Sequence, residues 1–132
     1  MRHLRFPLSL AVAVICASAA TSVATASRPI IARVWRGFVA TQNAEVYSRY
    51  LEEQGIQKFA SIPGNRGAEM SRSNGDRVEF VVVSYWNSKE GIQNFTGPEW
   101  DRVKPLPDDP KYLVGPPATV THYEVVSGVA GR

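Results

Sequence analysis

An eight-residue stretch constrains the fold of this chain more than any other. Residues 79–86, EFVVVSYW, are rich in β-branched and aromatic residues and are therefore predicted to form a β-strand. Alternate side chains of a strand point to opposite faces, so Val82 shares one face with Trp86 and Val83 shares the other with Tyr85. Both faces are apolar, which predicts that other parts of the protein cover both of them.

Strand and helix patterns alternate along the rest of the chain. Residues 30–39 are predicted to form the first strand, and residues 41–59 a helix, because apolar side chains recur there at helical spacing. The dipeptide Asn74-Gly75 predicts a tight hairpin turn in front of the central strand. Residues 118–126 are predicted to form the last strand.

Two helices are predicted between the hairpin and the last strand. Ser88 is expected to cap the first, and residues 97–104 are expected to form a second, shorter one. The resulting order is the β-α-β-β-α-β pattern of ferredoxin-like folds, an α+β class with an antiparallel sheet. Its helices cover one face of the sheet, so the other face is predicted to pack against a second copy of the chain, giving a homodimer.

The start of the chain is predicted to be a signal peptide over residues 1–26. A basic head precedes an apolar run that is shorter than the roughly 20 residues of a membrane-spanning helix, and small residues at 24–26 offer a cleavage site. We therefore expect a secreted or periplasmic protein, with residues 27–132 forming one domain whose core spans about 30–126.

Two kinds of membrane attachment are alternatives to cleavage and release. An uncleaved N-terminal segment would act as a membrane anchor, and this alternative stays open. A lipid anchor on Cys16 is disfavoured, because Ile15 stands where lipoprotein processing needs a small residue. With cleavage, we expect no stable membrane anchor.

Cleavage would also change which chemistry is available. It removes Cys16 and His3, so His122 would be the one remaining imidazole and no cysteine would remain. Disulfides, a cysteine nucleophile and a structural zinc site are then excluded, and we expect no metal. Loss of Arg2 and Arg5 lowers the net charge from +3 to about +1. The absence of a basic stripe argues against a nucleic-acid partner.

Several side chains are candidates for a functional site. His122 is the candidate catalytic acid or base because an imidazole titrates near neutrality, although a histidine that only packs on a strand is the alternative. Aromatic side chains on strands and helices are candidates for binding a flat ligand, or else ordinary core, and two arginines are candidates for an anionic oxygen, or else solvated surface. These substrate-binding candidates are Trp35, Arg36, Tyr47, Arg66, Trp86 and Phe95.

The chain resembles the antibiotic biosynthesis monooxygenase family of dimeric α+β barrels. The resemblance rests on IARVWRG, on PGNRG, on VEFVVVSYWNSKEGIQNF and on the terminal VTHYEV, and it covers about residues 30–126. It implies a homodimer whose sheets pack face to face, with a pocket in each subunit between sheet and helices. Characterised members oxygenate quinols and polyaromatic phenols without metal or flavin, so no cofactor is expected.

Another branch of that family degrades haem with an Asn, a Trp and a His. The corresponding positions here are Trp35 or Arg36, Phe95, and a position near Pro105. None of the three residue types matches, so haem degradation is disfavoured.

Two functions are therefore carried forward from the sequence. The first is an exported, cofactor-independent monooxygenase that acts on a small aromatic or quinol-type compound. The alternative is a binding module without turnover, which uses the same pocket to hold a small hydrophobic ligand.

Overall fold

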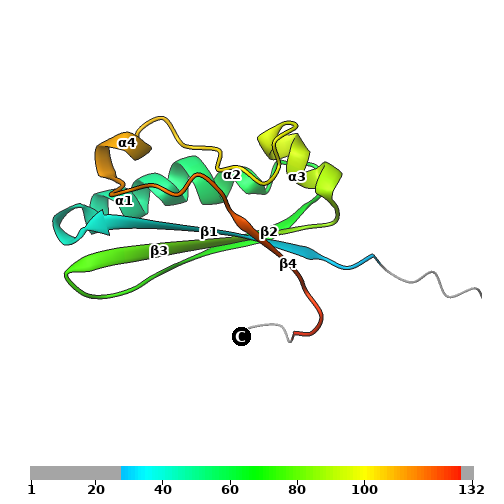
Figure 1. The fold of residues 1–132 in the computed structure, drawn as a ribbon, viewed down its shortest axis with the longest axis horizontal. Coiled ribbons are helices and arrows are strands. Elements are labelled where there is room, and N and C mark those ends of the chain that lie inside the picture. The colour runs from blue at the N-terminus through cyan, green and yellow to red at the C-terminus, as the bar shows by residue number, and fades with distance from the viewer. Residues whose placement is uncertain (1–27, 129–132) are drawn as a thin grey trace, which may run out of the picture.

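A four-stranded antiparallel sheet forms the base of the molecule, and the helices of the described residues lie on one side of it (Figure 1). The computed structural model describes residues 28–128, so the predicted signal peptide lies outside the described residues. The strands are ordered β2-β3-β1-β4. This confirms the predicted α+β, ferredoxin-like fold. The strands are β1 (Ile31–Ala40), β2 (Asn65–Arg72), β3 (Arg77–Trp86) and β4 (Thr121–Glu124).

The first helical segment runs without a break across residues 41–59. A short 3-10 turn, η1 (Thr41–Asn43), leads into α1 (Ala44–Leu51), and a π-helical turn, η2 (Glu52–Ile56), joins it to α2 (Gln57–Phe59). Gly55 lies inside the wider π-helical turn. The long predicted helix is thus present, with a local change of helical pitch at its glycine.

The second helical region differs in part from the sequence prediction. Helix α3 (Lys89–Thr96) is capped by Ser88, whose side chain accepts a hydrogen bond from the Gly91 backbone N–H, as predicted. The helix predicted at 97–104 is wrong. Gly97 ends α3 at a φ of 78°, and Arg102 then pairs with Thr119 as an extended bridge. A short helix, α4 (Asp109–Tyr112), forms instead in the proline-rich stretch that follows.

The hydrophobic core lies between the sheet and the helices. On β3, Phe80 and Trp86 are fully buried on this side, and Tyr47 of α1 and Ile92 of α3 are fully buried against them. The Tyr47 and Phe80 rings meet edge to face with centroids 5.2 Å apart. The alternation in the sequence of β3 therefore sets which side chains enter this core.

The opposite face of the sheet has no helix over it among the described residues (Figure 1). Val81, Val83 and Tyr85 of β3 point to this side and are only half-buried. Val83 pairs with Val34 of β1, and Tyr123 of β4 lies on the same side with 55 % of its surface exposed. We call this surface the open face. The predicted homodimer stays a prediction, because the structure holds one chain.

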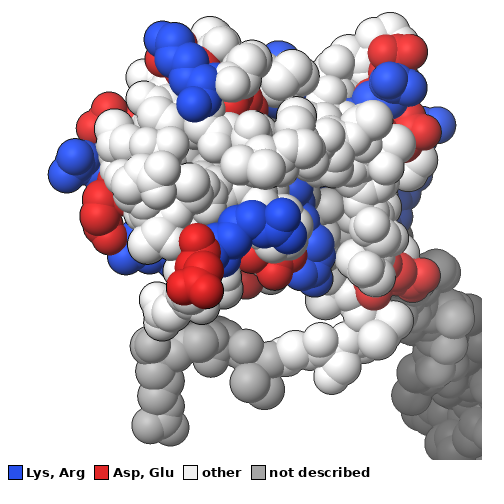
Figure 2. Space-filling view, turned by 60° about the vertical axis from the view of Figure 1, so that its left-hand side comes forward, with Lys and Arg blue, Asp and Glu red and all other residues white. Residues whose placement is uncertain are grey.

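Charge is mixed over the surface of the domain. On the side shown in Figure 2, Lys and Arg side chains alternate with Asp and Glu around a broad uncharged area. The ion pairs recorded for the described residues are exposed ones, such as Arg72–Glu45 at 2.7 Å. Between residues 28 and 128, no helix has the length and apolar character needed to cross a membrane.

Candidate functional site

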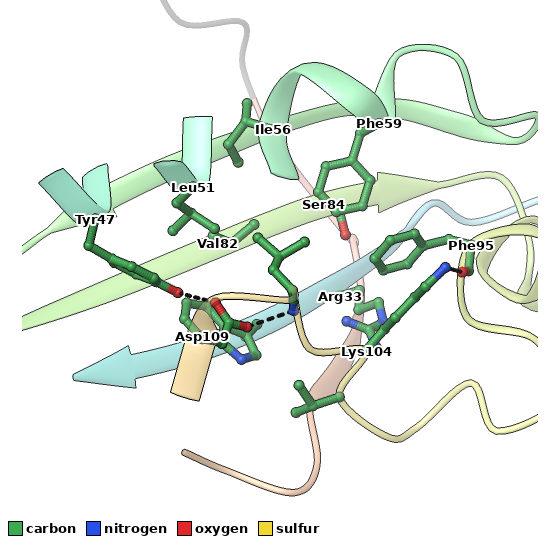
Figure 3. Close-up of a pocket in the computed structure, with 13 residues that line it drawn as sticks. Arg33, Tyr47, Leu51, Ile56, Phe59, Val82, Ser84, Phe95, Lys104 and Asp109 are labelled. Carbon is green, nitrogen blue, oxygen red and sulfur yellow. Dashed lines mark hydrogen bonds between the residues drawn. The ribbon is translucent and has the colours of Figure 1, made fainter. Parts of the chain in front are cut away.

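A small cavity of about 60 Å³ lies between the sheet and the helices (Figure 3). The sheet forms its floor, the first helical segment and α3 form its walls, and the loop between α3 and α4 closes it. Its lining residues are Arg33, Trp35, Tyr47, Leu51, Ile56, Phe59, Val82, Ser84, Phe95, Val103, Lys104, Leu106 and Asp109.

The floor of the cavity follows from strand alternation. Arg33 and Trp35 are two residues apart on β1, so both point toward the helices. Their partners on β3 are Ser84 and Val82, which face the same side. The floor thus joins an apolar patch at Trp35 to a polar patch at Arg33.

A buried carboxylate marks one part of the cavity. Asp109 is 6 % exposed, and its Oδ1 accepts a hydrogen bond from the Tyr47 hydroxyl at 3.1 Å. Its Oδ2 accepts from the Leu106 backbone N–H at 2.8 Å. Burial raises the pKa of Asp109 above its ordinary value, against the two hydrogen bonds, which lower it. A carboxylate with a raised pKa is a stronger base than a surface aspartate.

Tyr47 is held as a neutral donor to that carboxylate. Burial, followed by the charge and hydrogen bond of Asp109, raises the pKa of the Tyr47 hydroxyl far above its ordinary value. The phenol therefore stays protonated at neutral pH and keeps donating. The pair fixes the direction in which the carboxylate points (Figure 3).

A buried cation marks another part of the cavity. Arg33 is 5 % exposed, and its Nη2 donates to the Arg102 carbonyl at 2.7 Å. Burial lowers the pKa of its guanidinium to about 10, so it remains charged at neutral pH. The guanidinium carbon lies 5.6 Å from the centre of the Phe95 ring.

Lys104 adds a second cation at the solvent side of the cavity. Its side chain is exposed, and its Nζ donates to the Phe95 carbonyl at 2.7 Å. The same Nζ lies 4.9 Å from the centre of the Phe95 ring. The Phe95 ring is thus flanked by two positive charges, which suits a π-system.

The structure brings together three of the six predicted substrate-binding residues. Trp35, Tyr47 and Phe95 all line the cavity. Trp86 lies behind them, fully buried, and its Nε1 donates to the Ser84 hydroxyl at 2.8 Å. Trp86 therefore supports the cavity wall by stacking on Phe95, with ring centroids 6.1 Å apart.

The remaining predicted residues lie elsewhere. Arg36 is on the open face, where it pairs with Glu79 at 3.1 Å. Arg66 is exposed beside a separate surface hollow. His122 faces the helix side but does not line the cavity, since its ring stacks on Trp100 with centroids 4.2 Å apart.

The surroundings of His122 favour its neutral form. Burial is the main cause that lowers its pKa, and the positive charge of Arg33 adds to this effect. The carboxylate of Asp101 acts in the opposite direction. The imidazole therefore stacks as an uncharged ring at neutral pH.

Sequence reasoning missed the three charged residues of the cavity, which are Arg33, Lys104 and Asp109. Strand alternation held a usable signal for Arg33, because Trp35 was already a candidate and shares its face. Lys104 lies in an irregular loop and Asp109 begins the four-residue helix α4, and neither segment is long enough for periodicity to show which side chains turn inward. Within residues 28–128 no group of three or more His, Cys, Asp or Glu is placed to hold a metal.

Comparison with known proteins points to one family. Residues 39–99 match the model of the antibiotic biosynthesis monooxygenase family. The fold is shared with a candidate antibiotic biosynthesis monooxygenase from Bacillus cereus, at 15 % identity, covering 78 % of this chain and 99 % of that one, with a TM-score of 0.55. A second such protein, from Nitrosomonas europaea, gives 12 % identity over 76 % and 94 % of the two chains and a TM-score of 0.57.

A haem-degrading protein of Mycobacterium tuberculosis, MhuD, has the same fold. It gives 20 % identity over 77 % of this chain and 100 % of that one, with a TM-score of 0.53. No curated protein sequence matches the chain. At these identities the likeness to solved structures concerns the fold alone.

Proposed function

We propose that this protein oxygenates a small phenolic or quinol-type compound in the cavity between sheet and helices. The proposal starts from its domain of the antibiotic biosynthesis monooxygenase family. The observation that supports this most is the buried Asp109 carboxylate, which Tyr47 holds in a mostly apolar cavity. Such a group can take a proton from a phenol, and the resulting phenolate is electron-rich enough to react with oxygen.

The proposed reaction needs no electron donor other than the substrate. Asp109 removes the proton of the phenol, and the phenolate reduces O₂ and forms a new carbon–oxygen bond at a ring C–H position. The O–O bond then breaks, giving a quinone and one water molecule. The substrate supplies all four electrons, so phenol plus O₂ balances quinone plus water.

Asp109 takes the role that the sequence suggested for His122. His122 stays outside the cavity lining, whereas Asp109 is inside it with a raised pKa. Phe95 and Trp35 supply aromatic surfaces for a flat ring. A cavity of about 60 Å³ is smaller than the ~150 Å³ that holds benzene. The substrate would therefore enter by displacing the loop that carries Lys104.

The alternative function is a binding module without turnover. It is favoured by the apolar part of the cavity, where Leu51, Ile56 and Phe59 lie together. A hydrophobic molecule held there would need no base. The two functions share the cavity and differ only in whether Asp109 acts on a proton.

Oxygen consumption separates the two functions. The purified protein is mixed with a panel of quinols and polyphenols in an oxygen electrode, with catalase added to detect released peroxide. We expect one O₂ consumed per substrate and no return of oxygen from catalase. In Asp109→Asn the rate should fall about a hundredfold or more, as for loss of a general base. The exposed Asp101→Asn serves as the control.

Two outcomes would count against the oxygenase. An unchanged rate in Asp109→Asn would remove the proposed base. Tight binding of these compounds without any oxygen consumption would favour the binding module. The pH profile adds a further check, because the rate should rise as Asp109 ionises, at a pH above that of an ordinary aspartate.

We further propose that the protein acts as an exported homodimer. Export is predicted from the sequence of residues 1–26, and dimerisation through the open face would bury Val81, Val83 and Tyr85. Mass spectrometry of the natively produced protein tests export. A mature chain that begins near Ser27 is expected, and a cytoplasmic chain that retains Met1 would contradict it.

A further inference from the structure

Arg33 is charged, buried and short of partners. Its one recorded hydrogen bond is from Nη2 to the Arg102 carbonyl, and its buried Nε has no partner. None of the ion pairs among residues 28–128 includes it. A guanidinium has five N–H donors, so most of its donor capacity is free of protein acceptors.

An arrangement of this kind is costly unless an anion completes it. Buried charges in proteins are normally paired, because taking an ion out of water without a partner is strongly unfavourable. A planar guanidinium matches a carboxylate with two parallel hydrogen bonds. Arg33 lines the cavity, so a ligand in the cavity can supply that carboxylate.

The rest of the cavity sets the orientation of such a ligand. Figure 3 shows Arg33 and Lys104 together at one end and the Tyr47–Asp109 pair apart from them. A ligand carboxylate would be attracted by the two cations and repelled by Asp109. The Phe95 ring lies beside both cations and offers a surface for the ligand's own ring.

We propose that Arg33 is the recognition site for the carboxylate of an aromatic acid, held with its carboxylate at Arg33 and its ring against Phe95. This deepens the proposed function, on which it rests, by naming the substrate class as phenols that also carry a carboxylate. The hydroxyl of such a compound would point away from the cations, toward Asp109.

Binding of matched ligands tests the proposal without any turnover. Isothermal titration calorimetry compares benzoate with benzamide, which has the same shape and no charge, on the full-length mature protein. Benzoate should bind about tenfold to a hundredfold more tightly, as expected for hydrogen bonds to charged groups. Arg33→Gln should remove this preference, Arg33→Lys should keep part of it, and the exposed Arg49→Gln should leave it unchanged.

The comparison of the two ligands distinguishes recognition from a structural role. If Arg33 only tethers the loop through the Arg102 carbonyl, Arg33→Gln will weaken benzoate and benzamide equally, and the proposal is overturned. Equal affinities in the wild-type protein overturn it as well, even if Arg33→Gln fails to fold. Failure of both ligands to bind has the same consequence.

This result is separable from that of the oxygen-consumption experiment. Selective binding of benzoate with no oxygenation of any hydroxybenzoate would support the anion site and refute the oxygenase. Oxygenation of neutral quinols with no preference for benzoate would support the oxygenase and refute the anion site.

Discussion

The two faces of the sheet are built from the same strands and differ in what covers them. On β3, Phe80 and Trp86 are fully buried under the helices, whereas Val81 and Val83, one residue along from Phe80 and Val82, stay half-buried on the open face. Strand β3 thus contributes to the hydrophobic core on one side and to the uncovered apolar surface of the open face on the other. The difference shows that strand alternation determines which face each side chain occupies, whereas the helices determine which face is covered.

Arginine residues show the same contrast on a smaller scale. Arg33 and Arg36 lie three residues apart on β1 and point to opposite faces. Arg33 is buried in the cavity without a carboxylate partner, and Arg36 is exposed and paired with Glu79. An exposed pair of this kind contributes little, about 0–1 kcal/mol. The buried Arg33, which has no such partner, therefore calls for a specific role.

The largest effect is expected where the covered face is fully packed. Trp86→Ala should lower the free energy of unfolding by about 3–5 kcal/mol, because the indole is completely buried and its removal leaves a cavity. Urea denaturation followed by circular dichroism measures this loss. A cost below about 1 kcal/mol would mean that the core on this face is not close-packed.

The open face should respond through association. Val83→Asp places a carboxylate in the proposed dimer interface of each subunit, so we expect about a hundredfold weaker dimer, or about 2.7 kcal/mol. Sedimentation equilibrium at micromolar concentration measures it. The matched control is Val46→Asp, on the outer surface of α1, where the valine is 40 % exposed. A stable wild-type monomer would contradict the interface itself.

The fold was predictable because its signals are local and periodic. The alternation of β3 and the Ser88 cap each act within a few residues, and both are found in the structure. The predicted hairpin between β2 and β3 is also present, but its tight turn is not, because residues 73–76 form a longer loop and Asn74 does not adopt the positive φ of such a turn. The helix predicted at 97–104 failed because its backbone is fixed by a distant partner, Thr119. A tertiary contact of that kind leaves no trace in the local pattern.

The candidate site was less predictable, and the reason differs between its residues. Trp35 and Phe95 line the cavity because they lie on regular elements, whose periodicity shows where each side chain points. Lys104 comes from an irregular loop, and Asp109 from the first position of the four-residue helix α4, whose placement depends on contacts such as that between Asp109 and Tyr47. Asp109 needs a partner 62 positions away, so only the folded chain shows it.

The same chemical change on the two faces should have different costs. Tyr47→Phe removes the hydroxyl that donates to the buried Asp109, so we expect a loss of about 1–3 kcal/mol in unfolding free energy. Tyr85→Phe removes a hydroxyl that donates to Glu69 at 3.3 Å on the open face, where solvent replaces it, and should cost under about 0.5 kcal/mol. Equal losses in urea denaturation would show that the buried Tyr47–Asp109 bond contributes no more to stability than the exposed Tyr85–Glu69 bond.

The smallest expected effect is on the pH dependence of stability. It concerns two neighbours on β4 that point to opposite faces, His122 and Tyr123. Burial and the charge of Arg33 lower the pKa of His122 in the folded protein below its ordinary value of 6.5, so below that pH the unfolded chain binds more protons than the folded one. Stability from this group is therefore present above pH 6.5 and is lost as the pH falls through the lowered folded pKa.

Replacing the imidazole should remove that pH-dependent part. His122→Phe keeps an aromatic ring on Trp100 but cannot titrate, so its melting temperature should fall less than that of the wild type between about pH 7.5 and about pH 5. Tyr123→Phe, on the open face, should follow the wild type, because it leaves the imidazole of His122 in place. Parallel curves for His122→Phe and the wild type would mean that His122 is solvated like a surface histidine, and the covered side of β4 would then differ little from its open side.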